Sequence, residues 1–211
     1  MEGCGFVVND RVMPCANIHP SPEENFTIAA EDYMKAEEEG EIQCIYHSHT
    51  NEREGFSPAD IKACKQTNVP WLVYNVNTKN WKYADPREDL PYVGRDWVYG
   101  INDCYSLTRD FYRREFSIHL DDFERGEDGE WSSDNWNMFG ENYESQGFVD
   151  IDQPSQKGDI LLMKIDTKWP THFGVFKGKG LRLYHHLANR KSEETSYSKY
   201  WRQFTAKVLR H

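Results

Sequence analysis

The sequence predicts an α+β protein of two domains, on three observations. Residues 1–85 alternate short apolar runs with helix-like segments. Residues 84–91 place two prolines among charged side chains and show no periodicity, which is typical of a linker. Beyond them, one helix-like segment precedes three strand-like runs. We therefore expect domains over residues 1–85 and 95–211, with a linker over residues 86–94.

The first domain should contain four strands and two helices. Gly40 can end the first helix, and Ser57-Pro58-Ala59-Asp60 can start the second, because Ser is a good N-cap and Pro suits the first helical position. Asn77-Thr78-Lys79-Asn80 is typical of a turn between the last two strands. The expected strands are residues 2–8, 42–46, 71–76 and 81–83, and the expected helices are residues 29–39 and the segment that Ser57 starts.

The second domain should begin with a helix over residues 103–116, in which Leu107, Phe111 and Tyr112 share one face. An acidic loop region rich in Trp and Asn follows it. Three apolar runs then predict strands of an antiparallel sheet. These runs are residues 158–163, 172–176 and 181–185.

Charge and composition exclude several classes of function. The formal net charge of −10 argues against a sequence-independent nucleic-acid binder, whose surface would be basic. No apolar run approaches the roughly 18 residues that span a bilayer, and no signal-peptide pattern opens the chain, so we expect it to start in the cytoplasm. Five cysteines without a C-x-x-C pair argue against a disulfide framework and against a Cys-rich zinc site.

The charges are unevenly distributed along the second domain. Residues 119–152 hold eleven acids and one Arg, whereas residues 157–211 hold twelve Lys or Arg and four acids. Such blocks can pair within the molecule, line a charged cleft or simply form solvated faces.

Cys104 is the candidate nucleophile. It lies where a loop becomes a helix, and the positive end of the helix dipole favours a thiolate there. His172 opens an alternating strand that can hold an imidazole base, and His185 or its neighbour His186 on the next strand can orient that ring. Taken alone, Cys104 also fits a core cysteine on an amphipathic helix.

The order of these motifs resembles the NlpC-type papain-like peptidases. The matching motifs are Asp103-Cys104 at a helix start, Gly158-Asp159 before an apolar strand, His172-Phe173-Gly174-Val175-Phe176, and Leu183-Tyr184-His185-His186. The resemblance covers residues 95–211 and implies a papain-like fold with a helix packed on an antiparallel sheet. It implies that Cys104 is the nucleophile, His172 the general base and then acid, and His185 the orienting group, with Tyr99 on the oxyanion side.

A second chemistry is indicated by His47 and His49. Residues two apart on a strand project from the same face. Two imidazole nitrogens with the carboxylate of Asp60 make a ligand set that suits Zn²⁺ and leaves one coordination position open. In the alternative reading, Ser57 and Asp60 are only a capping pair, which is the commoner meaning of S-x-x-D.

The full spacing resembles the JAMM metalloprotease motif: His-Ser-His, seven residues, then Ser-x-x-Asp, with Glu-x-Cys-Gly far ahead. The resemblance implies a JAMM-like α/β sandwich over residues 1–85. The implied roles are zinc ligands for His47, His49 and Asp60, a base outside the coordination shell for Glu2, and an oxyanion contact for Ser57. Thr50 replaces the usual proline, and the sequence begins one residue before the motif glutamate. We therefore expect this end to fray and zinc-dependent turnover to be weak.

The pair of domains in this order resembles the tail-tip assembly protein K family of lambda-like phages. Further similarity lies in Trp97-Val98-Tyr99-Gly100, residues 141–148, Tyr200-Trp201 and residues 208–211. The family implies cleavage of amide bonds in peptidoglycan stem peptides, contacts with other tail-tip proteins, and a location first in the host cytoplasm and then at the virion tail tip. One alternative is a tail-tip assembly protein with one or both sites inactive. Another is a cytoplasmic, deubiquitinase-like or processing enzyme that uses the zinc centre.

Overall fold

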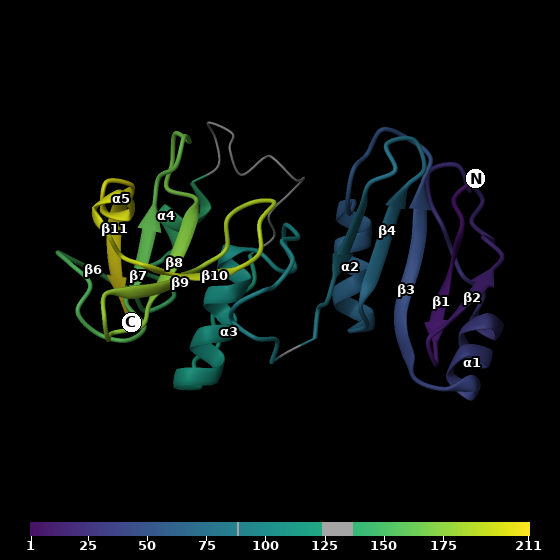
Figure 1. Cartoon of the computed structure of the whole chain (residues 1–211), viewed down its shortest axis with the longest axis horizontal. Coiled ribbons are helices and arrows are strands. Elements are labelled where there is room, and N and C mark those ends of the chain that lie inside the picture. The colour runs from purple at the N-terminus through teal and green to yellow at the C-terminus, as the bar shows by residue number, and fades with distance from the viewer. Residues whose placement is uncertain (88, 124–136) are drawn as a thin grey trace. The chain divides into compact units, whose positions relative to one another are not determined.

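The computed structural model describes residues 1–87, 89–123 and 137–211. Its contacts divide the chain into two compact units, Met1–Arg87 and Glu88–His211, and each unit contains one β-sheet (Figure 1). The predicted α+β class is confirmed. Residues 124–136 of the expected acidic loop lie outside the described residues. Within them, no helix is long and apolar enough to cross a bilayer.

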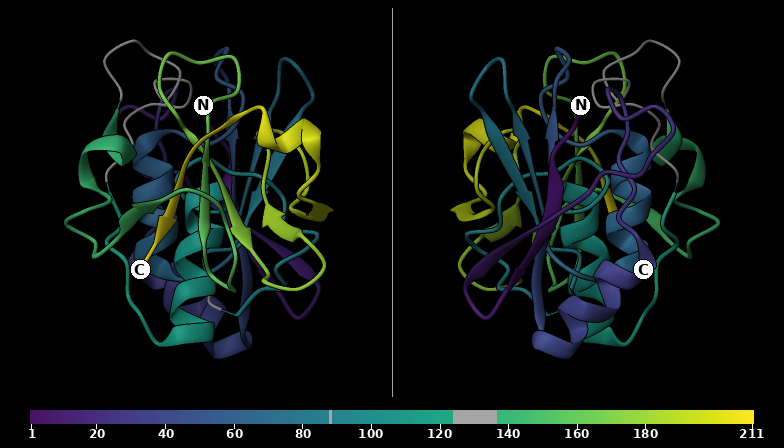
Figure 2. Two further views of the ribbon diagram at one scale, coloured as in Figure 1. Left: turned by 90° about the vertical axis from the view of Figure 1, so that its left-hand side faces the viewer. Right: turned by 90° about the vertical axis from the view of Figure 1, so that its right-hand side faces the viewer.

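The first unit is a five-stranded sheet in the order β2-β1-β3-β4-β5. β3 and β4 are parallel, and α2 supplies the crossover that a parallel pair requires. The other neighbours are antiparallel. The right-hand view of Figure 2 faces the purple N-terminal strands of this unit. The elements are β1 (Cys4–Val8), β2 (Arg11–Cys15), α1 (Ala30–Glu39), β3 (Ile42–His49), α2 (Pro58–Thr67), β4 (Trp71–Asn75) and β5 (Trp81–Ala84).

Local chemistry explains where α2 begins and ends. The Ser57 side chain accepts the Asp60 backbone N–H while the Asp60 carboxylate accepts the Ser57 backbone N–H, which is a complete capping box. Asn68 ends the helix in the left-handed conformation, which Asn tolerates well. β3 extends to His49, three residues beyond the expected strand over residues 42–46, so it carries both candidate histidines.

The second unit is a six-stranded antiparallel sheet in the order β10-β9-β8-β7-β11-β6. The expected helix and all three expected strands are present, with α3 packed on β8. The sequence reading missed the elements with short or polar sequences, which are β2 in the first unit and α4, β6, β10, α5 and β11 here. The bounds are α3 (Cys104–Phe116), α4 (Met138–Asn142), β6 (Val149–Ile151), β7 (Ile160–Met163), β8 (His172–Phe176), β9 (Arg182–His185), β10 (Glu193–Ser196), α5 (Lys199–Arg202) and β11 (Thr205–Arg210).

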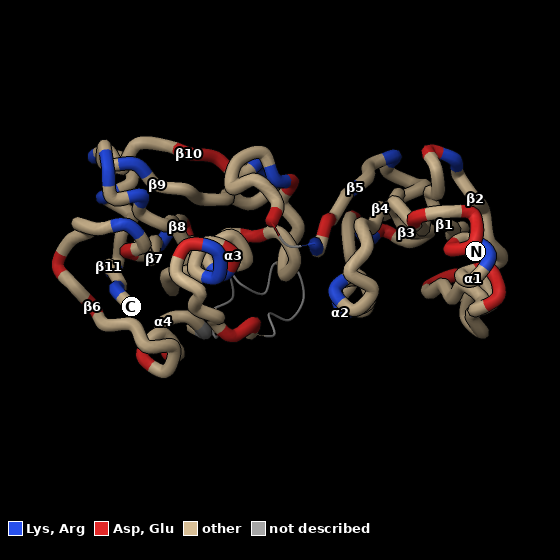
Figure 3. The backbone as a smooth tube through the Cα atoms, turned by 90° about the horizontal axis from the view of Figure 1, so that it is seen from below, with Lys and Arg blue, Asp and Glu red and all other residues tan. Residues whose placement is uncertain are grey.

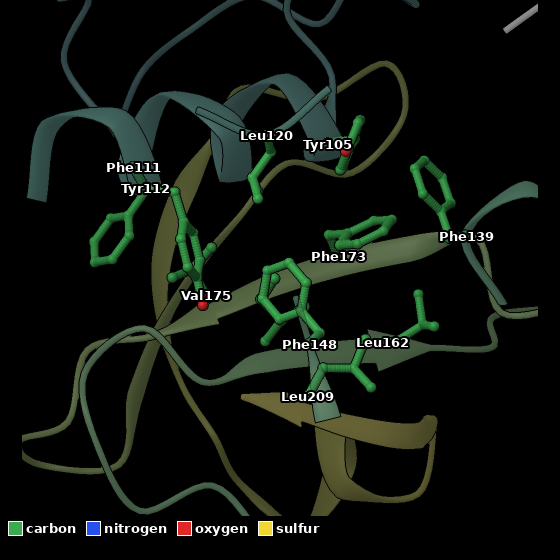
Figure 4. Close-up of a cluster of buried hydrophobic side chains, with 11 residues drawn as sticks. Tyr105, Phe111, Tyr112, Leu120, Phe139, Phe148, Leu162, Phe173, Val175 and Leu209 are labelled. Carbon is green, nitrogen blue, oxygen red and sulfur yellow. The ribbon is translucent and has the colours of Figure 1, made fainter. Parts of the chain in front are cut away.

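Both faces of this sheet bury apolar side chains. Ile160 and Leu162 of β7 join the cluster beneath α3 (Figure 4), whereas Leu161 and Met163 join a second cluster with Trp201. Strand side chains alternate between faces, so β7 is apolar at every position because it is covered on both sides. This rigid centre holds β8, and therefore His172, in place.

Some charges of the two sequence blocks meet within the unit. Lys207 Nζ lies 2.5 Å from Asp150 Oδ2, which joins the basic block to the acidic one. Arg210 binds the buried Asp159 carboxylate at 2.7 Å and so ties β11 to the start of β7. In Figure 3, blue and red segments alternate along this unit, while red dominates α1 in the first. Intramolecular pairing therefore accounts for part of the charge pattern.

Candidate functional site

Cys104 is the first residue of α3, directly after a helix cap built by Asp103. Asp103 Oδ1 accepts the Ser106 backbone N–H at 2.8 Å, and Oδ2 accepts the Gly100 N–H at 2.8 Å. Gly100 has φ of +77°, a conformation that glycine adopts without strain. Cys104 Sγ is half-buried and 3.8 Å from the Thr171 carbonyl oxygen. The thiol therefore lies at a helix N-terminus, where the dipole favours an anion.

His172 and His185 face each other across neighbouring strands. His172 Nε2 lies 3.2 Å from His185 Nδ1, and the Trp201 ring packs edge-on against His185 at 4.4 Å between centroids. Burial lowers the pKa of His172 to about 3, and the two nearby imidazoles act in the same direction. Burial also lowers the pKa of His185. Both rings are therefore neutral near pH 7, as a proton acceptor and its partner must be.

His186 is the first residue after β9 and makes a different contact from His185. Its Nε2 lies 3.0 Å from the Arg190 carbonyl oxygen, and burial lowers its pKa to about 4. It nevertheless lines the pocket beside Cys104. The contact with His172 is thus made by His185.

Cys104 and His172 open into one pocket of about 320 Å³. Its lining includes the stacked rings of Trp97 and Tyr99, 6.1 Å apart, and the exposed Tyr200. A pocket of this size with a largely aromatic wall can receive part of a peptide. The position of Tyr99 in this wall is compatible with its predicted oxyanion role, which stays a prediction.

The first unit brings His47, His49 and Asp60 together, with one ligand atom from each within 4.8 Å of the others. His47 Nε2 and His49 Nε2 are 3.1 Å apart, and they lie 3.3 and 3.4 Å from the two Asp60 oxygens. Burial raises the pKa of Asp60, but hydrogen bonds from both histidines outweigh it and hold the pKa far below its usual range. Two imidazole nitrogens and a carboxylate converging on one point fit a divalent cation, and this donor set suits Zn²⁺.

Glu2 does not fray as expected. Its backbone N–H donates to Pro22 O at 2.6 Å, Asn17 Nδ2 donates to its carbonyl at 3.1 Å, and only 1% of the residue is exposed. Burial raises the pKa of its carboxyl group, with His49 and His47 opposing, and its Oε1 is buried without a hydrogen-bond partner among the described residues. The carboxylate lines the same pocket as His49 and Asp60. The structure thus corrects our expectation of a loose terminus.

Ser57 and Asp60 form the capping pair of their motif, in a geometry that is compatible with the metal-ligand reading. They form the capping box, and the Ser57 hydroxyl donates to Asp60 Oδ2 at 2.7 Å, while the same carboxylate contacts His47 and His49. The cap therefore fixes the carboxylate beside the imidazoles. The oxyanion role of Ser57 stays a prediction.

Sequence reasoning missed two residues that support the histidines. Asn75 Nδ2 donates to the Arg53 carbonyl at 2.8 Å, and that carbonyl lies 3.3 Å from His49 Nδ1. Glu193, on the unpredicted β10, lies beside His185. Strand register, which places Asn75 opposite His49 and Glu193 opposite His185, is the signal that identifies both.

Comparisons with known proteins agree with this geometry. Residues 94–210 match the NlpC/P60 family, and residues 1–86 match the prokaryotic homologues of the JAB domain. The chain is 31% identical to tail tip assembly protein K of Escherichia phage N15, over 100% of this chain and 88% of that protein. It is 30% identical to tail tip assembly protein K of Escherichia phage lambda, over 87% of this chain and 89% of that protein. The chain therefore belongs to the tail tip assembly protein K family, with an NlpC/P60 domain as its second half.

Proposed function

We propose that this chain is a cysteine peptidase of a phage tail tip, which cleaves amide bonds in the stem peptides of peptidoglycan. The observation that carries the proposal is the buried contact of His172 Nε2 with His185 Nδ1, in the unit where His172 shares a pocket with the helix-start thiol of Cys104. Membership of the NlpC/P60 cysteine peptidase family supports the reaction class. The names of the two relatives support a place at the tail tip, among other tail proteins.

In this proposal the thiol of Cys104 gives its proton to His172, and Sγ attacks the carbonyl carbon of the substrate amide. Because His172 Nε2 contacts His185, Nδ1 is the nitrogen that takes the proton. The C–N bond then breaks as His172 returns the proton to the departing amine, which leaves a thioester on Cys104. Water, deprotonated by His172, hydrolyses the thioester and frees the thiol.

We propose that the first unit holds one Zn²⁺ through His47, His49 and Asp60. When bound, the metal supplies Lewis acidity for a carbonyl group. Glu2 lines the same pocket, and burial raises its pKa, which suits a group that takes up and releases a proton. The anchored position of Glu2 supports a working base more strongly than the sequence did.

Digestion of purified sacculi tests the peptidase assignment. Fragment release by the cysteine centre should persist in a metal chelator and disappear after thiol alkylation, whereas release by the zinc centre should show the reverse pattern. Masses of the released peptides identify the bond that is cut. Release that resists alkylation would contradict a role for Cys104.

A tail-assembly role without hydrolysis is the second candidate, because both relatives carry assembly in their names. Complementation separates the two candidates. A phage whose own copy carries Cys104→Ala should assemble complete tails but enter cells poorly if the peptidase acts at entry. Normal entry by that variant phage favours the assembly role.

A further inference from the structure

The proposed base requires one particular proton arrangement in the histidine pair. His172 can take the Cys104 proton through Nδ1 only if its Nε2 carries the hydrogen, since a neutral imidazole has one donor and one acceptor nitrogen. In that arrangement Nε2–H donates to His185 Nδ1 across 3.2 Å. His185 must then carry its own hydrogen on Nε2. The opposite arrangement would leave Nδ1 of His172 protonated and unable to act as base.

The group that can fix this arrangement lies on the next strand. β10 pairs antiparallel with β9, and Glu193 is directly opposite His185. Glu193 Oε1 lies 3.1 Å from His185 Nε2, although the two groups are not aligned as a hydrogen bond. His185 Nε2 is fully buried, whereas 52% of the Glu193 side chain is exposed. A small rotation of this exposed carboxylate brings the bond into line, and a buried polar nitrogen favours that rotation.

We propose that Glu193 is a positioning residue that selects the proton arrangement of both histidines. A carboxylate only accepts hydrogen bonds, so its presence keeps the hydrogen of His185 on Nε2. His185 Nδ1 then accepts from His172 Nε2, and His172 Nδ1 is left free for the Cys104 thiol. The negative charge also stabilises the protonated His172 that forms when the thiol ionises. This inference rests on the proposed function, because it assigns Glu193 to the same cysteine centre.

Among the described residues, the surroundings of His185 leave this role to Glu193. Trp201 covers one side of the ring, His172 contacts Nδ1, and the positive charge of Arg190 acts against protonation of His185. The next residue, Glu194, binds Lys177 at 2.7 Å and Arg182 at 2.5 Å instead. Glu194 is therefore a matched control on the same strand.

The test compares Glu193→Ala, Glu193→Gln and Glu194→Ala in the full chain. Two quantities are measured: fragment release from sacculi, and the rate at which iodoacetamide alkylates Cys104 between pH 5 and 9, followed on the peptide that contains it. The alkylation rate needs no substrate, so it remains informative if peptidoglycan is the wrong target.

We expect Glu193→Ala to lower fragment release and Cys104 alkylation at pH 7 by about tenfold, the effect of losing one charge-assisted hydrogen bond. The midpoint of thiolate formation should move to higher pH. Glu193→Gln keeps an acceptor and should retain more activity than Glu193→Ala, and Glu194→Ala should match wild type in midpoint. An unchanged alkylation midpoint in Glu193→Ala, or an equal shift in Glu194→Ala, overturns the inference. Absent fragment release with the expected alkylation shifts refutes the peptidoglycan substrate but supports the role of Glu193.

Discussion

Each of the two units holds a pair of imidazoles whose nearest nitrogen atoms lie 3.1 or 3.2 Å apart, yet the pairs suit different chemistry. In the first unit both Nε2 atoms point at one carboxylate, Asp60, which lies 3.3 and 3.4 Å away. In the second, His172 and His185 point at each other, and the carboxylate of Glu193 lies beyond the far ring. A carboxylate that contacts both imidazoles concentrates negative charge where a cation can bind. A carboxylate at the end of a row of hydrogen-bonded imidazoles instead determines which ring nitrogens carry the protons.

The titration of the histidines reflects this difference. Burial tends to lower the pKa of His49, but its hydrogen bond with Asp60, the charges of Asp60 and Glu2, and the contact with the Arg53 carbonyl together outweigh burial and raise the pKa. Among the described residues no carboxylate contacts His172, and burial lowers its pKa without opposition. The position of the acid, rather than the spacing of the histidines, therefore distinguishes the candidate metal site from the candidate base.

The largest expected effect is at the nucleophile. Cys104→Ala should reduce fragment release from sacculi by about three orders of magnitude or more, because the covalent route is lost. Its unfolding midpoint should stay close to wild type, since Cys104 is only half-buried. Kinetics of fragment release together with circular dichroism provide the measurement. Retention of more than a few per cent of the wild-type rate means that another group is the nucleophile.

The next test removes a ligand from the first centre. We expect about one zinc per chain by elemental analysis and its loss in His49→Ala, because two ligands hold zinc poorly. Glu2→Gln should keep the metal while any zinc-dependent peptidase activity disappears. A wild-type protein that takes up no zinc in equilibrium dialysis would refute the difference drawn between the two histidine pairs.

The two neighbouring histidines of the second unit provide a smaller, paired effect. His185→Ala should lower fragment release by about 100-fold, since His172 loses the partner that orients its ring, as in other catalytic triads. His186→Ala should cost less, because its ring contacts the Arg190 carbonyl instead. Steady-state rates of both variants decide the point. Equal losses would show that the contact with His172 does not matter for the reaction.

Removing a hydrogen bond that positions a candidate metal ligand should have a smaller effect than removing the ligand itself. Asn75→Asp removes the donor to the Arg53 carbonyl but keeps acceptors for the turn N–H groups of Asn77 and Thr78. Zinc affinity, measured by competition with a chromogenic chelator, should fall by about tenfold, since outer hydrogen bonds orient ligand imidazoles.

Asn77→Ala is the matched control for Asn75→Asp. It removes side-chain bonds to the carbonyls of Thr50 and Asn51 in the same loop, but leaves the Arg53 carbonyl in place. Zinc affinity should therefore stay within about twofold of wild type. If both variants bind zinc equally weakly, general loosening of the loop explains the effect.

The smallest effect concerns acid stability. Because the folded pKa of His172 is about 3 and the ordinary value is 6.5, its contribution to stability is complete above pH 6.5 and is lost as pH falls towards 3. The free energy of unfolding, measured with urea and followed on β8 amide signals, should fall between pH 7 and 5 by about 1 kcal/mol more in wild type than in His172→Gln. Identical slopes would show that His172 stays accessible to protons in the folded state.

The sequence alone predicted the fold class and most elements that carry chemistry. The Ser57 cap, the helix that begins at Cys104 and the apolar run of β7 are local patterns, and each appears where its pattern indicates. The strands that carry the candidate histidines, β3, β8 and β9, also follow from composition. Short polar strands such as β10 carry no such pattern, because their stability comes from pairing with a neighbour.

Only the tertiary structure decided which groups meet. Strand register brings Glu193 to His185 and Asn75 to His49, and register depends on how whole strands pair, not on local residue preferences. The anchoring of Glu2 likewise depends on Pro22 and Asn17, which are distant in sequence. Local chemistry therefore indicated the candidate reactive residues, and long-range pairing placed the acids that distinguish the candidate metal site from the candidate base.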